Sequence, residues 1–231
     1  MNMKRPLAAL LVLGIASVGL AAPAAAYDRD AYAYGAGHMI GHGDIPKALD
    51  MKKGASFSAY PSSGSNDLCF KEDSSKGVKY PGGEMQYSMG YEGRNRSGMS
   101  STVSQYASAT KAINAFDTLK ENLKQCDGTS SDSQTFDDGS TDSWERLTTS
   151  GSVPLVTVAG VESVFQNENY NDVSTGQYGG RYTSDTYTVY TLLNDVIITT
   201  NYYSGSELNL TKKQRRAVNQ VAFNAVTRWL D

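Results

Sequence analysis

The chain has 231 residues, which is enough for one large domain or two small ones. Hydrophobic residues make up 39% of it and charged residues only 19%, with a formal net charge of −3. This charge argues against nucleic acid as the partner, because phosphate binding needs a basic surface. The 15 Tyr, 6 Phe and 2 Trp argue against a chain that stays disordered.

Residues 1–26 have the three parts of a secretory signal peptide. Lys4 and Arg5 supply positive charge, Leu7 to Leu20 is an apolar run, and Ala24 to Ala26 supplies small residues for cleavage. A membrane anchor is the alternative, but spanning a bilayer needs roughly 20 apolar residues. We therefore expect a secreted, extracellular protein of the cell envelope, with no membrane span after cleavage. The Ala/Pro-rich cleavage site is typical of high-GC Gram-positive bacteria.

Residues 27–43 are rich in Gly, Ala and Tyr and have no periodic apolar face, which predicts a flexible N-terminal arm. His38 and His42 are four residues apart, a spacing that could hold a metal ion on a helix. The surrounding glycines disfavour a helix at this place. The sequence therefore predicts no metal site, and it indicates no cofactor.

The first half of the remaining chain predicts short strands followed by one long helix. Alternating apolar residues from Met85 to Tyr91 indicate a half-buried strand. Apolar residues from Tyr106 to Leu123 recur at spacings of 3 and 4, as on one face of a helix. The expected elements are a short helix at 44–49, strands at 56–60, 68–71 and 84–91, a helix at 101–125 and a polar loop at 128–142.

The second half predicts more strands and a final helix, which Thr211 and Gln214 open with a capping box. The expected elements are strands at 144–149, 153–165, 181–193 and 196–203, a loop at 166–180 and the helix from Thr211. This order lacks the strand-helix alternation of a parallel sheet. The sequence thus predicts an α+β fold for residues 44–231, with a single antiparallel sheet and two long amphipathic helices packed on one face.

Cys69 and Cys126 are the two cysteines of the chain. An even pair in an exported protein predicts a disulfide bond. The alternative is a cysteine nucleophile, which needs a histidine base and an orienting group. An oxidising compartment works against that alternative. The loop closed by the bond is long, and the chain-entropy estimate for it is roughly 4 kcal/mol.

Asn194 and Asp195 form a two-residue turn whose side chains tolerate positive φ, which predicts a β-hairpin. The pairing then places Leu193 opposite Val196 and turns the more apolar face of the hairpin toward the helices. The other face mixes aromatic rings with hydroxyl and amide groups, a combination that suits a ligand groove. The candidate ligand-binding residues on that face are Thr188, Tyr190, Asn201 and Tyr203. An ordinary solvated or loop-covered sheet face is the alternative.

Three other sets of polar residues could in principle have a function. Residues 137–142 lack the alternating acids of a calcium loop, so they predict a polar surface loop. The basic cluster from Lys212 to Arg216 is typical of a solvated helix face. Glu162 and Glu168 could serve as paired carboxylates of a hydrolase, although the sequence does not fix their distance. No catalytic residue is assigned.

A series of motifs runs through residues 44–231. Asp44-Ile45-Pro46 and Leu49 precede the strand that ends near Cys69; a helix that includes Phe116 to Leu119 ends at Cys126; then come the strand at 153–164 and the turn from Leu193 to Ile198. This series resembles the extracellular sensor domain of actinobacterial Ser/Thr kinases of the PknH type and its free-standing secreted relatives. A second resemblance is to lipoproteins of the LpqN type.

The resemblance implies an α+β domain with a cleft for an unidentified ligand. The kinase sensor domains have two disulfides, whereas this chain allows one, and we find neither a kinase nor a membrane anchor in it. A free binding protein therefore fits better than a signalling relay.

The function that the sequence favours is a secreted, monomeric, non-catalytic binding or sensor-like module. Its partner would be an unidentified small molecule or envelope ligand. The alternatives are a secreted hydrolase that uses acidic residues and an envelope structural or interaction protein that uses a Tyr-rich surface. Converging carboxylates would favour the hydrolase, and a flat aromatic patch would favour a protein partner.

Overall fold

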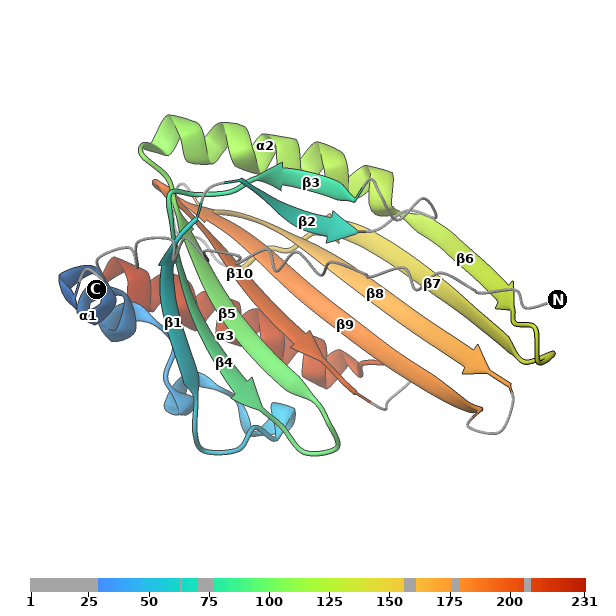
Figure 1. Ribbon diagram of the computed structural model, residues 1–231. Helices are drawn as coiled ribbons and strands as arrows, with labels where there is room; N and C mark the ends of the chain where they lie inside the picture. Colours follow the sequence, from blue (N-terminus) through green and yellow to red (C-terminus); the bar gives the residue numbers. More distant parts are fainter. Residues whose placement is uncertain (1–28, 63, 70–76, 156–160, 176–178, 206–208) are drawn as a thin grey trace, which may run out of the picture.

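The computed structural model describes residues 29–62, 64–69, 77–155, 161–175, 179–205 and 209–231 (Figure 1). The predicted signal peptide at 1–26 lies outside the described residues. The helices are α1 (Arg29–His38), α2 (Ala109–Cys126) and α3 (Lys212–Leu230), with 3-10 turns η1 (His42–Asp44) and η2 (Lys47–Leu49). The strands are β1 (Ser56–Pro61), β2 (Ser65–Cys69), β3 (Val78–Pro81), β4 (Met85–Glu92), β5 (Gly98–Gln105), β6 (Gly128–Thr135), β7 (Thr141–Ser152), β8 (Glu162–Ser174), β9 (Gly180–Leu193) and β10 (Val196–Tyr203).

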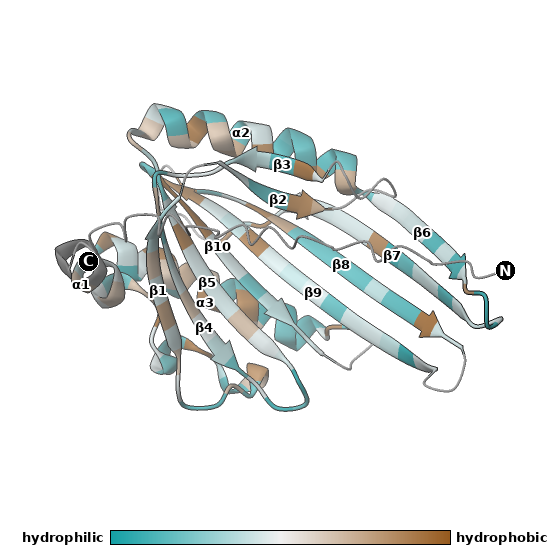
Figure 2. Cartoon of the chain, in the orientation of Figure 1, coloured by the Kyte–Doolittle hydropathy of each residue, from teal (hydrophilic) through white to brown (hydrophobic). Residues whose placement is uncertain are grey.

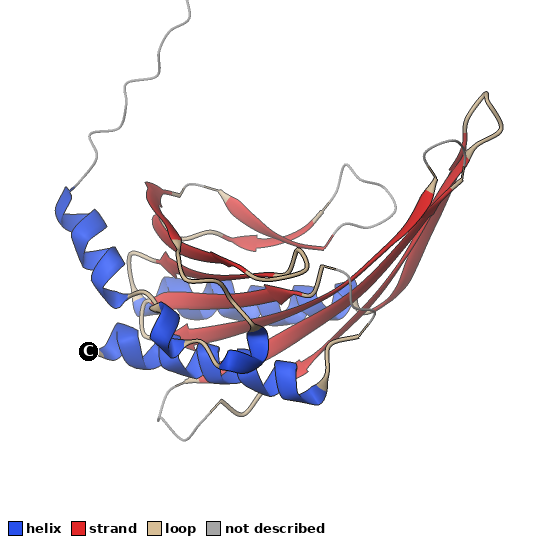
Figure 3. Ribbon diagram, turned by 90° about the horizontal axis from the view of Figure 1, so that it is seen from below, coloured by secondary structure: helices blue, strands red, loops and turns tan. Residues whose placement is uncertain are grey.

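The described strands form two sheets. Eight of them make one antiparallel sheet in the order β1-β4-β5-β10-β9-β8-β7-β6, and β2 and β3 make a small second sheet. Helix α3 packs on one face of the large sheet, and α2 packs with the small sheet on the opposite face (Figures 1 and 3). We call the α3 side the back face and the other side the front face.

The predicted fold class, with a single sheet and both long helices on one face, is therefore wrong. In the part of the chain that the structure describes, strand is the largest class, with 49% strand against 27% helix. The physical reason is that the central strands carry apolar side chains on both faces, so each face needs its own cover. Ile197 and Ile198 show this directly, because these consecutive residues of β10 lie in different hydrophobic clusters.

The predicted hairpin register between β9 and β10 is confirmed. Val196 pairs with Leu193, and Ile198 pairs with Thr191. Asn194 has a φ of 51°, the left-handed conformation that this turn requires. Because the register fixes which side chains share a face, Val196 is buried with Val189 on the back face, the side that was expected to meet the helices.

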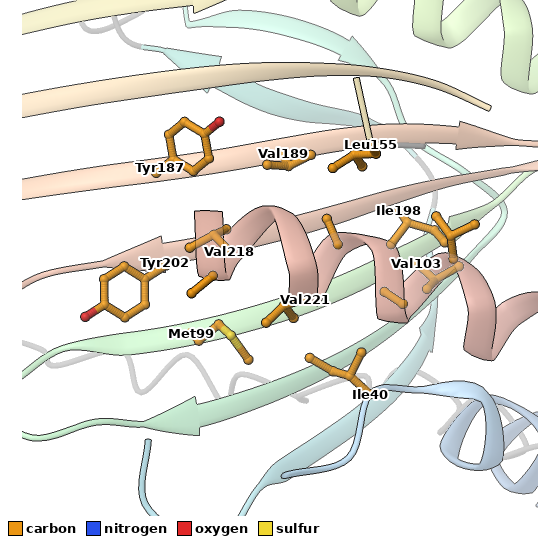
Figure 4. Packing of buried hydrophobic residues seen from close by; sticks show 14 of the residues in the cluster. Ile40, Met99, Val103, Leu155, Tyr187, Val189, Ile198, Tyr202, Val218 and Val221 are labelled. Atoms are coloured by element: carbon orange, nitrogen blue, oxygen red, sulfur yellow. The ribbon is translucent and has the colours of Figure 1, made fainter. Parts of the chain in front are cut away.

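The back-face core fills the space between the large sheet and α3. Val218 and Val221 of α3 meet Val189 and Ile198 of the sheet there (Figure 4). Thr211 caps α3, with its Oγ1 accepting from the backbone N–H of Gln214, as the sequence predicts. The apolar face of α3 thus packs against the apolar back-face side chains of β9 and β10.

The front-face core lies between α2, the small sheet and one end of the large sheet. Phe116 and Leu119 of α2 are fully buried against Ile197 and its neighbours. The predicted disulfide between Cys69 and Cys126 is present and joins β2 to the end of α2, with 5.9 Å between the two Cα atoms. The bond therefore fixes the small sheet to the helix that covers the front face.

The segment expected as a flexible arm makes specific contacts. Residues 29–38 form α1, and Met39 and Ile40 are buried in the back-face core. The phenol of Tyr91 donates a hydrogen bond of 2.8 Å to the carbonyl of Ile40. The ring of Tyr34 lies edge-on to Trp229 of α3. From the sequence, this segment is expected to lack packing, because it has no periodic apolar face. The structure differs, since the adjacent apolar residues Met39 and Ile40 pack into the core without such a periodicity.

The start of the first long helix also differs from the sequence-based expectation. The helix expected at 101–125 begins only at Ala109, where Ser108 caps it, and residues up to Gln105 belong to β5.

In the part of the chain that the structure describes, no helix combines the length and the apolar character needed to cross a membrane.

The expected loops at 128–142 and 166–180 contain all of β6, the start of β7 and most of β8. These strands continue past both α2 and α3 as an uncovered extension of the large sheet (Figure 3), which we call the wing. It comprises residues 128–135, 141–147, 168–174 and 180–184. The wing is mostly hydrophilic (Figure 2), and it has no alternating apolar pattern because neither of its faces packs on a helix.

Candidate ligand-binding cleft

A cleft of about 450 Å³ lies on the front face, where the small sheet stands over the middle of the large sheet. Its wall comes from β2 and β3, through Asn66, Asp67, Leu68 and Tyr80. Its floor comes from β4, through Gln86, and from β5, β8, β9 and β10 of the large sheet. The principal floor residues are Thr102, Gln166, Glu168, Thr186, Thr188, Tyr190, Thr199 and Asn201.

The floor is polar because the front-face side chains of the central strands change character along their length. On β10 the front-face series runs from buried Ile197 under α2 to Thr199 and Asn201 in the cleft. On β9 it runs from Leu192 to Tyr190 and Thr188. The apolar end of this face is covered by α2 and the polar end is left accessible, so the cleft begins where the front-face core ends.

Hydrogen bonds hold the polar side chains of the floor in place. Asn201 Nδ2 donates to Thr188 Oγ1 at 2.7 Å across the β9–β10 pair. The phenol of Tyr190 donates to Gln166 Oε1 at 3.1 Å. Gln166 Nε2 in turn donates to the backbone carbonyl of Leu68 at 3.1 Å, which connects the floor to the wall. These bonds give the cleft a fixed arrangement of hydroxyl and amide groups before any ligand arrives.

The wall is also held from outside the cleft. Asn122 of α2 donates to the carbonyl of Lys79 at 2.6 Å, and the phenol of Tyr106 donates to the carbonyl of Pro81 at 2.8 Å. Tyr80 packs edge-on against Tyr190, with 6.2 Å between the ring centroids. Burial raises the pKa of both these tyrosines, so each phenol stays protonated.

The two carboxylates of the cleft are each paired with a cation. Glu168 Oε1 lies 3.4 Å from Arg146 Nε, and Asp67 Oδ1 lies 3.3 Å from Lys79 Nζ. Burial raises the pKa of the Glu168 carboxyl, and the positive charge of Arg146 opposes that rise. Since the charges compensate one another, the lining presents hydroxyl and amide groups without a net charge.

A second hollow of about 530 Å³ adjoins the cleft on the front face. Lys52, Ser100, Asn201 and Tyr203 contribute to its lining, and Asn201 also lines the cleft, so the two hollows share a side chain. Tyr203 is 42% exposed. Its ring lies over Gly98, where a Cβ atom would collide with it. The glycine therefore lets the aromatic ring lie flat on the sheet.

The structure brings all four predicted ligand-binding residues onto the front face. Thr188, Tyr190 and Asn201 line the cleft, and Tyr203 lines the adjoining hollow. Tyr190 differs from the expectation of an accessible ring, because it is 5% exposed under the small sheet. Whether any of the four binds a ligand stays a prediction.

The paired carboxylates suggested for a hydrolase do not converge. Glu162 and Glu168 lie on the same face of β8 but six residues apart, which separates them by about 20 Å. Retaining and inverting glycosidases hold their carboxylates about 5–9.5 Å apart. Glu162 instead pairs with Lys120 at 2.9 Å.

The two histidines lie apart from the cleft, near the back-face core. His38 Nδ1 lies 2.7 Å from the carbonyl of Tyr34, and His42 Nε2 lies 3.2 Å from that of Met51. Among the described residues, no group of three or more His, Cys, Asp or Glu side chains is placed to hold a metal ion.

Sequence reasoning missed the wall residues and Gln166 of β8, and it singled out Glu168 only as a carboxylate of a hydrolase. Gln166 and Glu168 were expected in a loop, because the polar stretch after Phe165 hides the continuation of β8. Asn66, Asp67 and Tyr80 lie far from the hairpin in the sequence. The signal that could have found them is the disulfide, since it brings β2 and its partner β3 to the front face beside α2.

These features define a protein with a two-sided antiparallel sheet, a disulfide-linked small sheet and a neutral polar cleft. No family model matches the sequence. No curated protein matches it either. Among solved structures, it is similar to the extracellular domain of PknH from Mycobacterium tuberculosis, with a TM-score of 0.45 and 14% identity over 84% of this chain and 94% of that chain.

Proposed function

We propose that the protein is a secreted, non-catalytic binding module, sensor-like in that it holds a ligand without transforming it. The ligand would be a small polar molecule, or the polar part of an envelope component, bound in the front-face cleft. The observation that supports this proposal is the lining itself: its hydroxyl and amide groups are oriented by mutual hydrogen bonds and its carboxylates are neutralised. A fixed, uncharged polar surface complements an uncharged ligand rich in hydrogen-bonding groups.

The proposal is tested first by native mass spectrometry of the protein purified from the medium in which it is produced. We expect a retained small molecule that is released on denaturation. Thr199→Val and Asn201→Ala, which remove polar groups from the cleft, should lower the retained fraction. Thr183→Val is the matched control, because Thr183 lies on the back face of β9.

Loss of the ligand in the control as strongly as in the cleft variants would contradict a binding site at the cleft. A hydrolase stays a weaker candidate, because the carboxylates that sequence reasoning paired lie about 20 Å apart.

A further inference from the structure

The front face of the wing carries a group of aromatic side chains in mutual contact. Trp144 of β7 and Tyr170 of β8 stack with 6.4 Å between ring centroids and 29° between ring planes. Tyr182 of β9 follows at 6.3 Å from Tyr170. We call these three residues the aromatic strip. It runs across three neighbouring strands of the sheet, perpendicular to their direction.

The strip is held rigidly and still has accessible ring surface. The guanidinium of Arg146 lies 5.7 Å from the Trp144 ring and 5.6 Å from the Tyr170 ring. The phenol of Tyr170 donates to Asp172 at 3.2 Å. Tyr182 is 45% exposed. In the wing segments 141–147, 168–174 and 180–184 no side chain is fully buried, so these rings are not part of a core.

The strip is continuous with the cleft. Arg146, which lies against two of the rings, also pairs with Glu168 of the cleft floor at 3.4 Å. Glu168 and Tyr170 are next neighbours on the front face of β8. Along β9, Tyr182 lies six residues from Thr188, which corresponds to about 20 Å. A ligand that occupied the cleft and the strip together would therefore be an extended chain of several units.

The side chains along the cleft and the aromatic strip indicate which kind of extended ligand could bind there. The inner strands are hydrogen-bonded on both sides, so an extended peptide finds no unpaired backbone groups on this face and only side chains can bind. A phosphate polymer would meet the neighbouring carboxyl groups of Asp142 and Asp172. A hydrogen bond between these two groups, with a smaller contribution from their repulsion, raises the pKa of Asp142. A sugar ring combines an apolar C–H face, which stacks on an aromatic ring, with hydroxyl groups for the amide and hydroxyl side chains of the cleft.

We propose that the ligand is a neutral oligosaccharide that binds in the cleft and continues along the front face onto the wing, where Trp144, Tyr170 and Tyr182 stack against its sugar rings. This proposal rests on the proposed function, because it names the ligand class of the same cleft. It adds a second contact region that the cleft alone does not require.

The two tryptophans of the chain provide a direct test. Trp144 lies in the strip, whereas Trp229 packs against Tyr34 and Tyr87 near α1. The ¹⁵N-labelled, oxidised protein is titrated with maltohexaose, cellohexaose, chitohexaose and α-1,6-linked mannohexaose, and both indole N–H signals are followed by NMR. We expect at least one hexasaccharide to shift the Trp144 signal and leave the Trp229 signal in place.

Variants separate stacking from a structural role. Tyr182→Ala should weaken binding of the active hexasaccharide by about tenfold, which corresponds to the loss of one aromatic stacking contact. Tyr182→Phe should keep the affinity, because it keeps the ring. Leu147→Ala is the control, because it removes an exposed apolar side chain from β7 on the back face. Thermal unfolding of each variant checks that the wing stays folded.

The outcomes are distinguishable. A hexasaccharide that shifts the side-chain amide of Asn201 but not the Trp144 indole would overturn the role of the strip and support the cleft as a binding site. A different molecule retained in the cleft, together with no response to any of the four sugars, would overturn the oligosaccharide and leave the proposed function in place. Equal affinities of Tyr182→Ala and the wild type would also overturn the stacking contact.

Discussion

Ile197 and Ile198 test whether the large sheet is buried on both faces. Their side chains are 0% and 1% exposed, on the front and the back face. Replacing either by alanine removes three carbon atoms, which at about 0.8 kcal/mol per buried methylene costs about 2.4 kcal/mol in transfer free energy. The cavity left behind adds to this cost, and the usual range is about 2–5 kcal/mol. We expect each substitution to lower the free energy of unfolding by about 3–4 kcal/mol.

The assay is urea denaturation of the oxidised protein, followed by circular dichroism, with the m-value checked for constancy. Ile113→Ala is the matched control, because the same atoms are removed from a side chain of α2 that is 45% exposed. It should change the free energy of unfolding by less than about 0.5 kcal/mol. If Ile197→Ala were as mild as Ile113→Ala while Ile198→Ala remained costly, the packing of α2 and the small sheet on the front face would be refuted.

Three further predictions follow from the fold. Thiol titration of the unfolded, unreduced protein should find no free thiol at Cys69 or Cys126, and reduction should lower the free energy of unfolding by up to roughly 4 kcal/mol; two titratable thiols would contradict the bond. Ile40→Ala should cost about 2–5 kcal/mol in the same denaturation assay, because Ile40 is fully buried, and an unchanged midpoint would mean that residues 27–43 do not pack on the domain. Burial raises the pKa of the Asp185 carboxyl. The protonated carboxyl therefore contributes fully to stability below the pKa of about 3.9 that it has in the unfolded chain, and this contribution is lost as the pH rises through the folded pKa. The stability of the wild type relative to Asp185→Asn should therefore increase as the pH falls from 7 toward 4, and a difference independent of pH would argue against a raised pKa.

Local chemistry explains which parts of the fold the sequence could predict. The turn at Asn194 requires a positive φ, the start of α3 needs a side-chain cap at Thr211, and two cysteines in a chain with the pattern of a signal peptide favour a bond. Each of these features depends on a few neighbouring residues or on a count. The hairpin register, and with it the face of each candidate residue, followed from the turn alone.

Long-range packing explains the errors. Leu192 and Ile197 are apolar residues on the front face, and such residues indicate strands that are buried on both sides. In the sequence, however, they are equally compatible with a hairpin that has only one buried face. The residues of β5 before Tyr106 extend the helical pattern of α2 by coincidence of spacing. The wing strands escaped prediction because their position depends on pairing with β9 rather than on burial of an apolar face.

The candidate site was predictable only in part for the same reason. Thr188 and Asn201 share a face by register, so the floor could be inferred. The wall, with Asn66 and Tyr80, reaches the floor through tertiary contacts that no local pattern encodes.

The Cys69–Cys126 bond gives the cleft a maturation step. The wall of the cleft belongs to the small sheet, and β2 of that sheet ends at Cys69, next to the carbonyl of Leu68 that accepts from Gln166. Before oxidation, wall and floor are joined by hydrogen bonds and packing alone; afterwards, the wall is tied covalently to the helix above it. Oxidation therefore fixes the position of the wall over the floor, and bonds of this kind form and persist in oxidising compartments rather than in the reducing cytoplasm.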